Sequence, residues 1–381
     1  MPKVKKRGDK YTALVWVPDP QKPLGKSQRR ITRRTKGEVE KEIRRIEISK
    51  DEGTYTQPLK RLVADYFPET LERYIATADI RPQTANDYRT WLKNHIVPKM
   101  GHFQLQELNS FTIESILLKV QSSGGKNGKP LSNSSMRQIG IVLSVCLKTA
   151  VRHKHLKQNP MSDVRLPKGH KKEVRALSIE ELERVGEVLL GSDLLTSSIV
   201  GLARDTGARK GELLALRWSD IDFEKNIISI SKTAYDRPGV RYENPPKSKN
   251  STRKVELTAN QFQTLKSWRK RQSEQRLRAG SHWLDQDYVF TNGRGERISG
   301  GYPYALWIKI CEEAGIERVP FHSLRHSHIT TLLRAGRPAH IVARRVGDLP
   351  TTILQTYAHI MPLDDQHSAI TFEKAISSGS M

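Results

Sequence analysis

Three short segments of the chain carry residues suited to chemistry on an anion. Arg209 follows a glycine turn at the expected start of a helix, and Glu212, three positions on, is placed to orient its guanidinium. His322 and Arg325 fall on one face of a second helix, and Tyr357 falls near the end of a third. Guanidinium groups bind oxyanions through paired donors, while histidine and tyrosine transfer protons or attack electrophiles. Each segment alone also has an ordinary explanation, as a surface arginine, a chance His-x-x-Arg pair or a packing tyrosine, so its meaning depends on the elements around it.

The chain is strongly basic. Its 381 residues hold 65 Lys and Arg against 41 Asp and Glu, a formal net charge of +24, which predicts a polyanionic partner, with nucleic acid foremost. No stretch approaches the ~18 apolar residues of a membrane span, and no apolar run follows the charged start to make a signal peptide. We therefore expect a cytoplasmic protein with no membrane partner. The two cysteines, Cys146 and Cys311, are too few for a disulfide framework or a cysteine zinc site.

The length predicts two or three domains at about 150 residues each, and the first of them is small. The first fifty residues hold sixteen Lys and Arg against six Asp and Glu. Residues 11–17 and 29–34 have the composition of strands, and an apolar stripe predicts a helix over residues 36–50. A basic tail is the ordinary explanation, but Trp16 among alternating apolar residues favours order. We predict a small α+β domain over residues 1–55 that binds a polyanion.

Two larger domains follow. Residues 59–164 carry four apolar stripes at helical spacing and predict an all-α domain. Residues 165–176 are basic around Pro and Gly, and form either a solvated linker or a strap along phosphates. Ser178 and Glu181 are spaced as a capping box, and from there the pattern is helix, β and helix again, so residues 177–361 are expected to be a mixed, mainly helical α+β domain. The expected strands in it are residues 227–230, 255–257 and 288–290.

In their order and spacing, the three segments resemble the tyrosine recombinases, the phage-integrase family of site-specific DNA recombinases. The similarity covers about residues 60–361. Its most specific parts are three motifs: Thr-Gly-x-Arg followed by a Glu and by Leu-x-Trp-x-Asp-Ile-Asp; His-x-x-Arg; and, near the end, Tyr-x-His. The basic first domain resembles the arm-site binding domain of integrases from Gram-positive phages and conjugative transposons. The resemblance implies an integrase that inserts and excises a mobile element at the bacterial nucleoid.

Carried onto this sequence, the resemblance makes Tyr357 the nucleophile and places Arg209, His322 and Arg325 around the scissile phosphate. Two guanidinium forks suit the charge that builds on the nonbridging oxygens. A phenol with a pKa near 10 needs a positive field or a base before it attacks. The family's 3′-phosphotyrosyl link would store the bond energy and lead to exchange through a Holliday junction.

The resemblance also implies a lysine that donates a proton to the leaving 5′-oxygen. Residues 246–257 match the family's pattern and select Lys247, with Lys249 as second choice. A solvated basic hairpin is the ordinary explanation. The sequence has no phosphate-binding glycine loop and no carboxylates clustered at metal-ligand spacing. We therefore expect no metal, ATP or other cofactor.

One position departs from the family's pattern. Nine residues before the nucleophile, where a His or Trp usually donates to the phosphate, this chain has Asp348. The carboxyl is either protonated, or turned aside to pair with Arg209 or another cation, or replaced in its role by a histidine. The candidate replacements are His326, His328 and His359. We favour the second interpretation, because an aspartate among cations is expected to stay charged and paired.

Further residues are expected to bind DNA outside the active site. They are Lys5, Lys6, Arg7, Arg29, Arg30, Arg33, Arg34, Lys168, Lys171 and Lys172. The expected partners are double-stranded attachment sites, both core and arm, three further copies of the chain in a homotetramer on DNA, and an excisionase or a DNA-bending host factor. Residues 362–381 either dock onto a neighbouring subunit, as such tails do in the family, or fray. Two alternatives remain: a non-cleaving DNA-binding regulator of the same fold, and an enzyme like type IB topoisomerases, against which the separate arm-binding segment argues.

Overall fold

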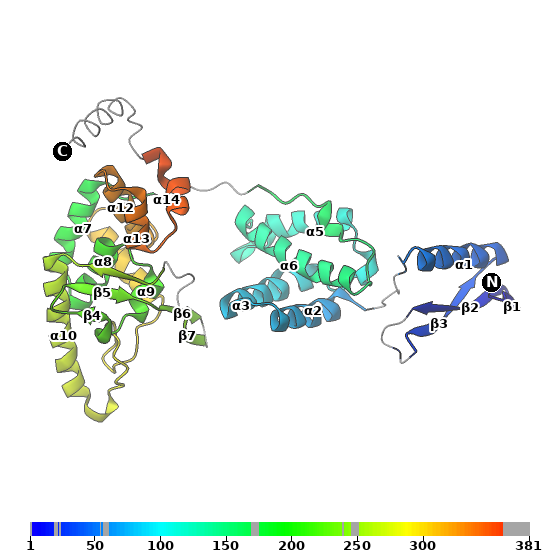
Figure 1. Ribbon diagram of the computed structural model, residues 1–381, viewed down its shortest axis with the longest axis horizontal. Helices are drawn as coiled ribbons and strands as arrows, with labels where there is room; N and C mark the ends of the chain where they lie inside the picture. Colours follow the sequence, from blue (N-terminus) through cyan, green and yellow to red (C-terminus); the bar gives the residue numbers. More distant parts are fainter. Residues whose placement is uncertain are drawn as a thin grey trace, which may run out of the picture. The chain divides into compact units, whose positions relative to one another are not determined.

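A computed structural model of the chain describes residues 2–18, 22, 24–53, 55, 61–168, 175–237, 240–244 and 251–360. The chain divides into two compact units, Met1–Lys171 and Lys172–Met381. Figure 1 labels the helices and strands along the chain. The architecture mixes α and β and is mainly helical, as predicted. Within the described residues, no helix is long and apolar enough to cross a membrane.

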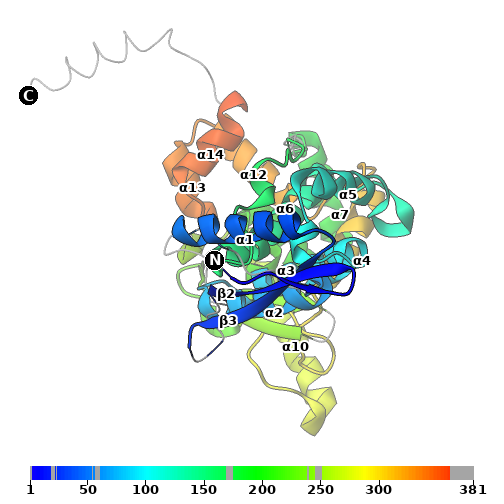
Figure 2. The ribbon, with the colours of Figure 1, turned by 90° about the vertical axis from the view of Figure 1, so that its right-hand side faces the viewer.

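The first unit begins with a three-stranded antiparallel sheet and one helix. These elements are β1 (Lys5–Arg7), β2 (Lys10–Pro18), β3 (Lys26–Arg33) and α1 (Lys36–Asp51). β2 lies in the centre of the sheet, and α1 runs along one side of it (Figure 2). The helix begins at a capping box, in which the Thr35 side chain accepts a hydrogen bond from the Glu38 amide and the Glu38 side chain accepts one from the Thr35 amide. Strand β1 was not predicted separately; the other strands and the helix lie close to their predicted positions.

The two faces of this sheet differ. Val15 and Val17 on β2 are buried against α1, whereas Leu14 and Trp16 point the other way and are 47% and 49% exposed. Side chains alternate along a strand, so this division follows from the sequence. Trp16 therefore belongs to an open, partly apolar face, and the small core is built by the valines together with α1.

The remainder of the first unit is helical. Its elements are α2 (Val63–Thr77), α3 (Pro82–Trp91), α4 (Val97–Met100), α5 (Ser110–Ser123) and α6 (Asn133–Arg152). A π-helical turn, Leu92–Ile96, joins α3 to α4, so that together they form the second of the four predicted stripes. Pro82 opens α3, where its missing N–H costs nothing. Phe67, Leu71 and Leu143 are fully buried in the shared core.

The second unit combines helices with short strands. Its helices are α7 (Ile179–Gly191), α8 (Leu194–Thr206), α9 (Lys210–Ala215), α10 (Ala259–Ala279), α11 (Tyr302–Glu313), α12 (Ser323–Arg334), α13 (Ala339–Val346) and α14 (Pro350–Tyr357). Its strands are β4 (Ile221–Asp222), β5 (Ile227–Ile230), β6 (Thr233–Arg237), β7 (Val240–Asn244) and β8 (Arg253–Glu256). Strands β4, β5 and β8 form one antiparallel sheet and β6 and β7 form a hairpin. The predicted capping box of Ser178 and Glu181 opens α7.

One predicted strand is wrong and one hairpin was missed. Residues 288–290 form no strand; Tyr288 makes only an isolated bridge to Arg217. Val289 and Phe290 are fully buried, and the Val289 carbonyl accepts hydrogen bonds from side chains of α10. Their β-like composition therefore reflects burial in the core. The β6–β7 hairpin, rich in charged and polar residues, gave no alternating apolar signal.

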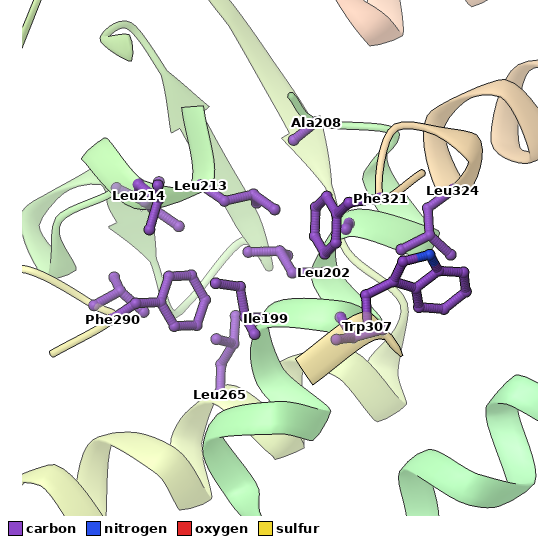
Figure 3. Close-up of a cluster of buried hydrophobic side chains, with 14 of the residues drawn as sticks. Ile199, Leu202, Ala208, Leu213, Leu214, Leu265, Phe290, Trp307, Phe321 and Leu324 are labelled. Atoms are coloured by element: carbon purple, nitrogen blue, oxygen red, sulfur yellow. The ribbon is translucent and has the colours of Figure 1, made fainter. Parts of the chain in front are cut away.

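The main core of the second unit surrounds α8 and anchors the segments of interest. Figure 3 shows Leu213 and Leu214 of α9 and Leu324 of α12 facing buried side chains of α8 and α11. Arg209 precedes α9, and Arg325 directly follows Leu324. The same core therefore fixes both backbones that carry the arginines.

A second, smaller core holds the last three helices together. It contains Ile329 and Leu333 of α12, Val346 of α13, and Ile353 and Tyr357 of α14. Helices α13 and α14 lie beside each other and beside α12 in both ribbon views (Figures 1 and 2). The Tyr357 ring is one of its packing elements, so the position of the phenol depends on this core.

Candidate active site

Arg209 stands at the turn between α8 and α9. Gly207 ends α8 in the left-handed conformation, with φ 62°, and a Cβ there would lie 2.9 Å from the His328 ring; both features require glycine. The Arg209 amide and Nη1 each donate to Glu212, at 2.9 Å. The predicted contact between Arg209 and Glu212 is therefore confirmed.

Glu212 is also paired with Arg253 in the interior. Both side chains are 3% exposed, and Arg253 Nη2 donates to Glu212 Oε2 at 2.8 Å. Burial raises the pKa of Glu212, but the hydrogen bond and charge of Arg253, with those of Arg209, outweigh burial and lower the pKa below its usual value. The sequence-based prediction missed Arg253, although it is the arginine of the matched run of residues 246–257.

Arg325 ties two helix ends together. Its Nη1 donates to the Gly207 carbonyl at 2.7 Å and to the Val346 carbonyl at 2.8 Å, at the C-termini of α8 and α13. Helix C-termini carry partial negative charge and hold a cation favourably. Only 3% of the Arg325 side chain is exposed, so this guanidinium forms the floor of the site.

Asp348 lies between the two arginines. Its Oδ2 accepts from Arg325 Nη2 at 2.6 Å, and its Oδ1 accepts from Arg209 Nη2. Gly347, with φ 71°, ends α13 and brings the carboxylate to this point. Burial raises the pKa of Asp348, but the charges and hydrogen bonds of both arginines outweigh it and lower the pKa. The carboxylate is therefore paired with both arginines, as the favoured interpretation predicted, and its lowered pKa favours the ionised form over the protonated alternative.

Two of the histidines considered as replacements are placed elsewhere. His328 Nε2 accepts from Arg345 Nε at 3.1 Å, which leaves the proton on Nδ1, 3.0 Å from the Arg204 carbonyl oxygen. Both of its nitrogens are thus engaged, and burial lowers its pKa to about 4. His359 is exposed in the turn after α14. The structure gives neither histidine the position expected of the missing phosphate donor.

Tyr357, the last residue of α14, is 6% exposed, and its hydroxyl contacts His326 Nδ1. Burial raises the pKa of Tyr357 to about 12; the Arg325 charge opposes this and the Asp348 charge adds to it. The predicted nucleophile is therefore a protonated phenol at rest. Sequence reasoning considered His326 only as a phosphate donor, although its spacing of four from His322 puts both on one face of α12.

His322 lies at the open side of the site. Its ring is 4.8 Å from the His326 ring. Burial, followed by the charges of His326 and Arg325, lowers the pKa of His322 to about 4. The residue keeps an exposed surface, so water offsets part of this desolvation. A neutral imidazole here has one N–H to offer to an oxyanion.

Some predicted residues lie outside the described part of the chain. They are Lys247, Lys249, Lys171, Lys172 and the tail of residues 362–381. The segment with Lys247 joins β7 to β8. Lys168 is described and exposed, and its carbonyl accepts from Asn133 Nδ2 at 2.9 Å.

The basic residues around the N-terminal sheet of β1, β2 and β3 are divided between the two faces of that sheet. Arg30 pairs in register with Leu14, and Lys5 with Thr12, so both share the open face with Trp16. Arg29 pairs with Val15 and belongs to the face that α1 covers. The others with described positions around this sheet are Lys6, Arg7, Arg33 and Arg34. The open face thus joins positive charge to exposed apolar surface.

Comparison with known proteins identifies the family. Residues 175–363 match the model of the phage integrase family. A protein named tyrosine recombinase XerC-like, from Caldanaerobacter subterraneus subsp. tengcongensis, is 30% identical over 294 residues, which are 72% of this chain and 72% of that protein. The chain belongs to the phage integrase family of tyrosine recombinases. It is thus a site-specific DNA recombinase, and the resemblance seen in its motifs is confirmed.

Other relatives of this tyrosine recombinase come from mobile elements. The ICEBs1 integrase of Bacillus subtilis is 28% identical over 305 residues, covering 78% of this chain and 79% of that one. The Tn1549 transposon integrase, solved in complex with transposon right end DNA, has a TM-score of 0.64 at 17% identity, over 83% of this chain and 99% of that one. At that identity the second comparison supports the fold alone.

The acid stability of the recombinase should depend on Asp348. Its pKa is lowered in the folded protein, so the carboxylate stabilises the fold above its unfolded pKa of about 4, and the stabilisation is lost as pH falls through the folded pKa. Asp348→Asn should lower the free energy of unfolding by about 1–3 kcal/mol at pH 7, with a difference that shrinks progressively as the pH falls below about 4 toward the lowered folded pKa of Asp348. Calorimetric unfolding at each pH measures this. Glu187→Gln, at an exposed position on α7, is the control, and a difference that persists undiminished at pH 3 would contradict the prediction.

Proposed function

We propose that the recombinase cleaves and rejoins DNA through a 3′-phosphotyrosyl link to Tyr357, and so integrates and excises a mobile element. The observation that carries this proposal is that the predicted catalytic side chains of three distant segments lie together in one site. Arg209, Arg325 and Tyr357 come from three distant segments, and the two arginines share the Asp348 carboxylate while their neighbour Tyr357 is close enough for Arg325 to perturb its pKa.

The chemistry of each group suits phosphoryl transfer. Attack on a phosphodiester puts negative charge on the nonbridging oxygens, and Arg209 and Arg325, held by Glu212 and by two helix ends, are pre-organised to receive it. His322 would donate from the open side, and Lys247 would protonate the leaving 5′-oxygen. No step in this scheme uses a metal, ATP or another cofactor.

Asp348 acts in this scheme as a positioning residue. It accepts hydrogen bonds from both guanidinium groups and thereby fixes the distance between them. Because it is an acceptor, it does not replace the donor that the family usually has at this position, so binding of the phosphate relies more heavily on Arg209 and His322.

The proposed partners are core and arm attachment sites in double-stranded DNA and three further copies of the chain. A lambda integrase has been solved as a tetramer bound to a Holliday junction, which supports a homotetramer on DNA here. Residues 59–164 and 177–361 would each contact the core site, residues 1–55 would bind the arm site, and residues 165–176 would follow the phosphates. An excisionase or a DNA-bending host factor would set direction.

The test is to trap the covalent intermediate. A duplex from the DNA that flanks the gene, nicked near the candidate cleavage site so that religation fails, is incubated with the full chain in EDTA. We expect a denaturant-resistant protein–DNA adduct that mass spectrometry maps to Tyr357. Mapping to another residue, or an adduct that requires a divalent cation, would overturn the proposed mechanism.

A second prediction concerns the open face of the first domain. Lys5→Ala with Arg30→Ala should lower the dependence of DNA affinity on salt by about two units in the log–log slope, because each phosphate contact contributes about 0.9. Lys41→Ala with Arg44→Ala removes the same charge from exposed positions of α1 and is the matched control. Titrations of the full chain at several salt concentrations measure both slopes; equal slopes would place the contact surface elsewhere.

The two alternative functions make different predictions. A non-cleaving regulator would form no adduct in the trapping experiment. An enzyme like type IB topoisomerases has no need of a second DNA site, so deletion of residues 1–55 would leave its activity intact. For an integrase, the same deletion should abolish recombination and spare cleavage of the core site.

A further inference from the structure

The contact between His326 and Tyr357 is not explained by phosphate binding. His326 is half-buried on α12, and its Nδ1 lies against the Tyr357 hydroxyl, with the ring centroids 5.8 Å apart. The imidazole therefore touches the atom that attacks phosphorus. A side chain that merely packed there would need no polar atom at this point.

The charges around this pair favour a neutral imidazole. The groups that face His326 are His322 at the N-cap of α12, Arg325 on α12, Asp348 in the turn before α14, and Tyr357 on α14. Burial and the Arg325 charge lower the pKa of His326, against a smaller opposing effect of Asp348. At neutral pH the ring is therefore uncharged, and one nitrogen is free of a proton.

The phenol cannot ionise unaided at a useful rate. Burial raises the pKa of Tyr357 to about 12, so at pH 7 only about one molecule in 10⁵ would carry a phenolate. His322, which the resemblance places around the scissile phosphate, has its ring beside that of His326, whereas the Tyr357 hydroxyl is in direct contact with His326 itself. A base in direct contact with the hydroxyl is required.

We propose that His326, with its resting proton on Nε2, is the general base that takes the Tyr357 proton during DNA cleavage. The Oη–H bond breaks and the proton passes to Nδ1 while Oη bonds to phosphorus and the bond from phosphorus to the 5′-oxygen breaks. The general acid protonates that oxygen. In rejoining, the 5′-hydroxyl returns its proton to the general acid and its oxygen bonds to phosphorus, while the bond from phosphorus to Oη breaks and His326 gives its proton back to Oη. The inference rests on the proposed function and adds a catalytic residue to it.

The test compares two amide replacements with the full-length wild type, using the nicked duplex described above. His326→Asn places an amide oxygen or nitrogen where Nδ1 was, and so keeps the contact with Tyr357 without a basic atom. His326→Gln places it near Nε2 instead. His340→Asn, at an exposed position of α13, is the matched control. The rate of adduct formation is measured from pH 6 to pH 9.

With His326 as base, the wild-type rate should be constant from about pH 7 to pH 9, because burial and the Arg325 charge hold the pKa of the imidazole below its usual value. His326→Asn should be slower by about 10²–10⁴-fold at pH 7, with a rate that rises tenfold per pH unit, because attack then awaits ionisation of the phenol. Added imidazole should partly restore His326→Ala. The His340→Asn variant should match the wild type.

Several results would overturn the inference. One is a His326→Asn variant with the wild-type rate and pH profile. Another is a wild-type rate that itself rises tenfold per pH unit from pH 7 to 9, which needs no variant and so does not depend on folding. Failure of the proposed function looks different: the wild type would then form no adduct at Tyr357 at any pH.

Discussion

Replacing Tyr357 by phenylalanine should abolish covalent attachment to DNA and leave DNA affinity within about twofold of the wild type, since phosphate contacts set that affinity. The substitution removes one oxygen and keeps the ring that packs against Ile329 and Ile353. The hydroxyl contacts His326 and faces the interior, so its loss should cost the fold only about 1 kcal/mol. Adduct formation on the nicked duplex and affinity titrations measure the two effects.

A matched substitution makes this result specific. Tyr304→Phe removes the same atom from an exposed tyrosine of α11 and should form the adduct at the wild-type rate. Persistent adduct with Tyr357→Phe would assign the nucleophile to another residue. Weak DNA binding by Tyr357→Phe would show that the hydroxyl supports the fold or the DNA surface instead of the chemistry.

Replacing Glu212 by alanine should cause the largest loss of stability in the site. It leaves the Arg253 guanidinium, 3% exposed, without its charge partner, which costs about 3–5 kcal/mol for a buried pair. A typical domain has only about 5–15 kcal/mol in total. The same change releases Arg209, whose amide and Nη1 both bind Glu212, so adduct formation should also fall by about 10²-fold or more.

A double substitution separates the two effects. Glu212→Leu with Arg253→Met replaces the buried pair by apolar side chains, and should recover most of the stability, since such replacements are often neutral. Adduct formation should stay low, because the Arg209 amide and Nη1 still lack the Glu212 carboxylate that orients them, and only the Nη2 contact with Asp348 remains. Calorimetric unfolding and the trapping assay report the two quantities. A Glu212→Ala variant within about 1 kcal/mol of the wild type would contradict the expected cost of the buried pair.

The parts of the site that sequence predicted well are local. A glycine turn, an arginine and a glutamate three residues later fix one another within a single turn of helix, so the contact between Arg209 and Glu212 followed from spacing alone. The same holds for the capping box of Ser178 with Glu181, and for Tyr357 at the end of a helix.

The parts that sequence missed depend on how distant segments meet. Arg253, at the start of β8, reaches Glu212 of α9, and His326 of α12 reaches Tyr357 at the end of α14. Neither long-range contact leaves a periodic pattern in the sequence from which it could have been predicted. Asp348 was predicted only in part. The surplus of basic residues in the sequence indicated that its carboxylate would be paired, but the structure was needed to show that it bonds both Arg209 and Arg325.

Arg325 joins the ends of α8 and α13 through two backbone carbonyls, whereas the Tyr357 hydroxyl contacts, among the described residues, a single imidazole. This difference should set the order in which the gene of a mobile element that no longer moves accumulates inactivating mutations. Once selection for movement ends, a copy in which Tyr357 is replaced by phenylalanine should still encode a folded protein that binds its DNA site without cleaving it, so that such a copy persists. A copy that loses Arg325 loses the protein as well. Surviving inactive descendants should therefore differ first at the tyrosine and keep the arginine longest.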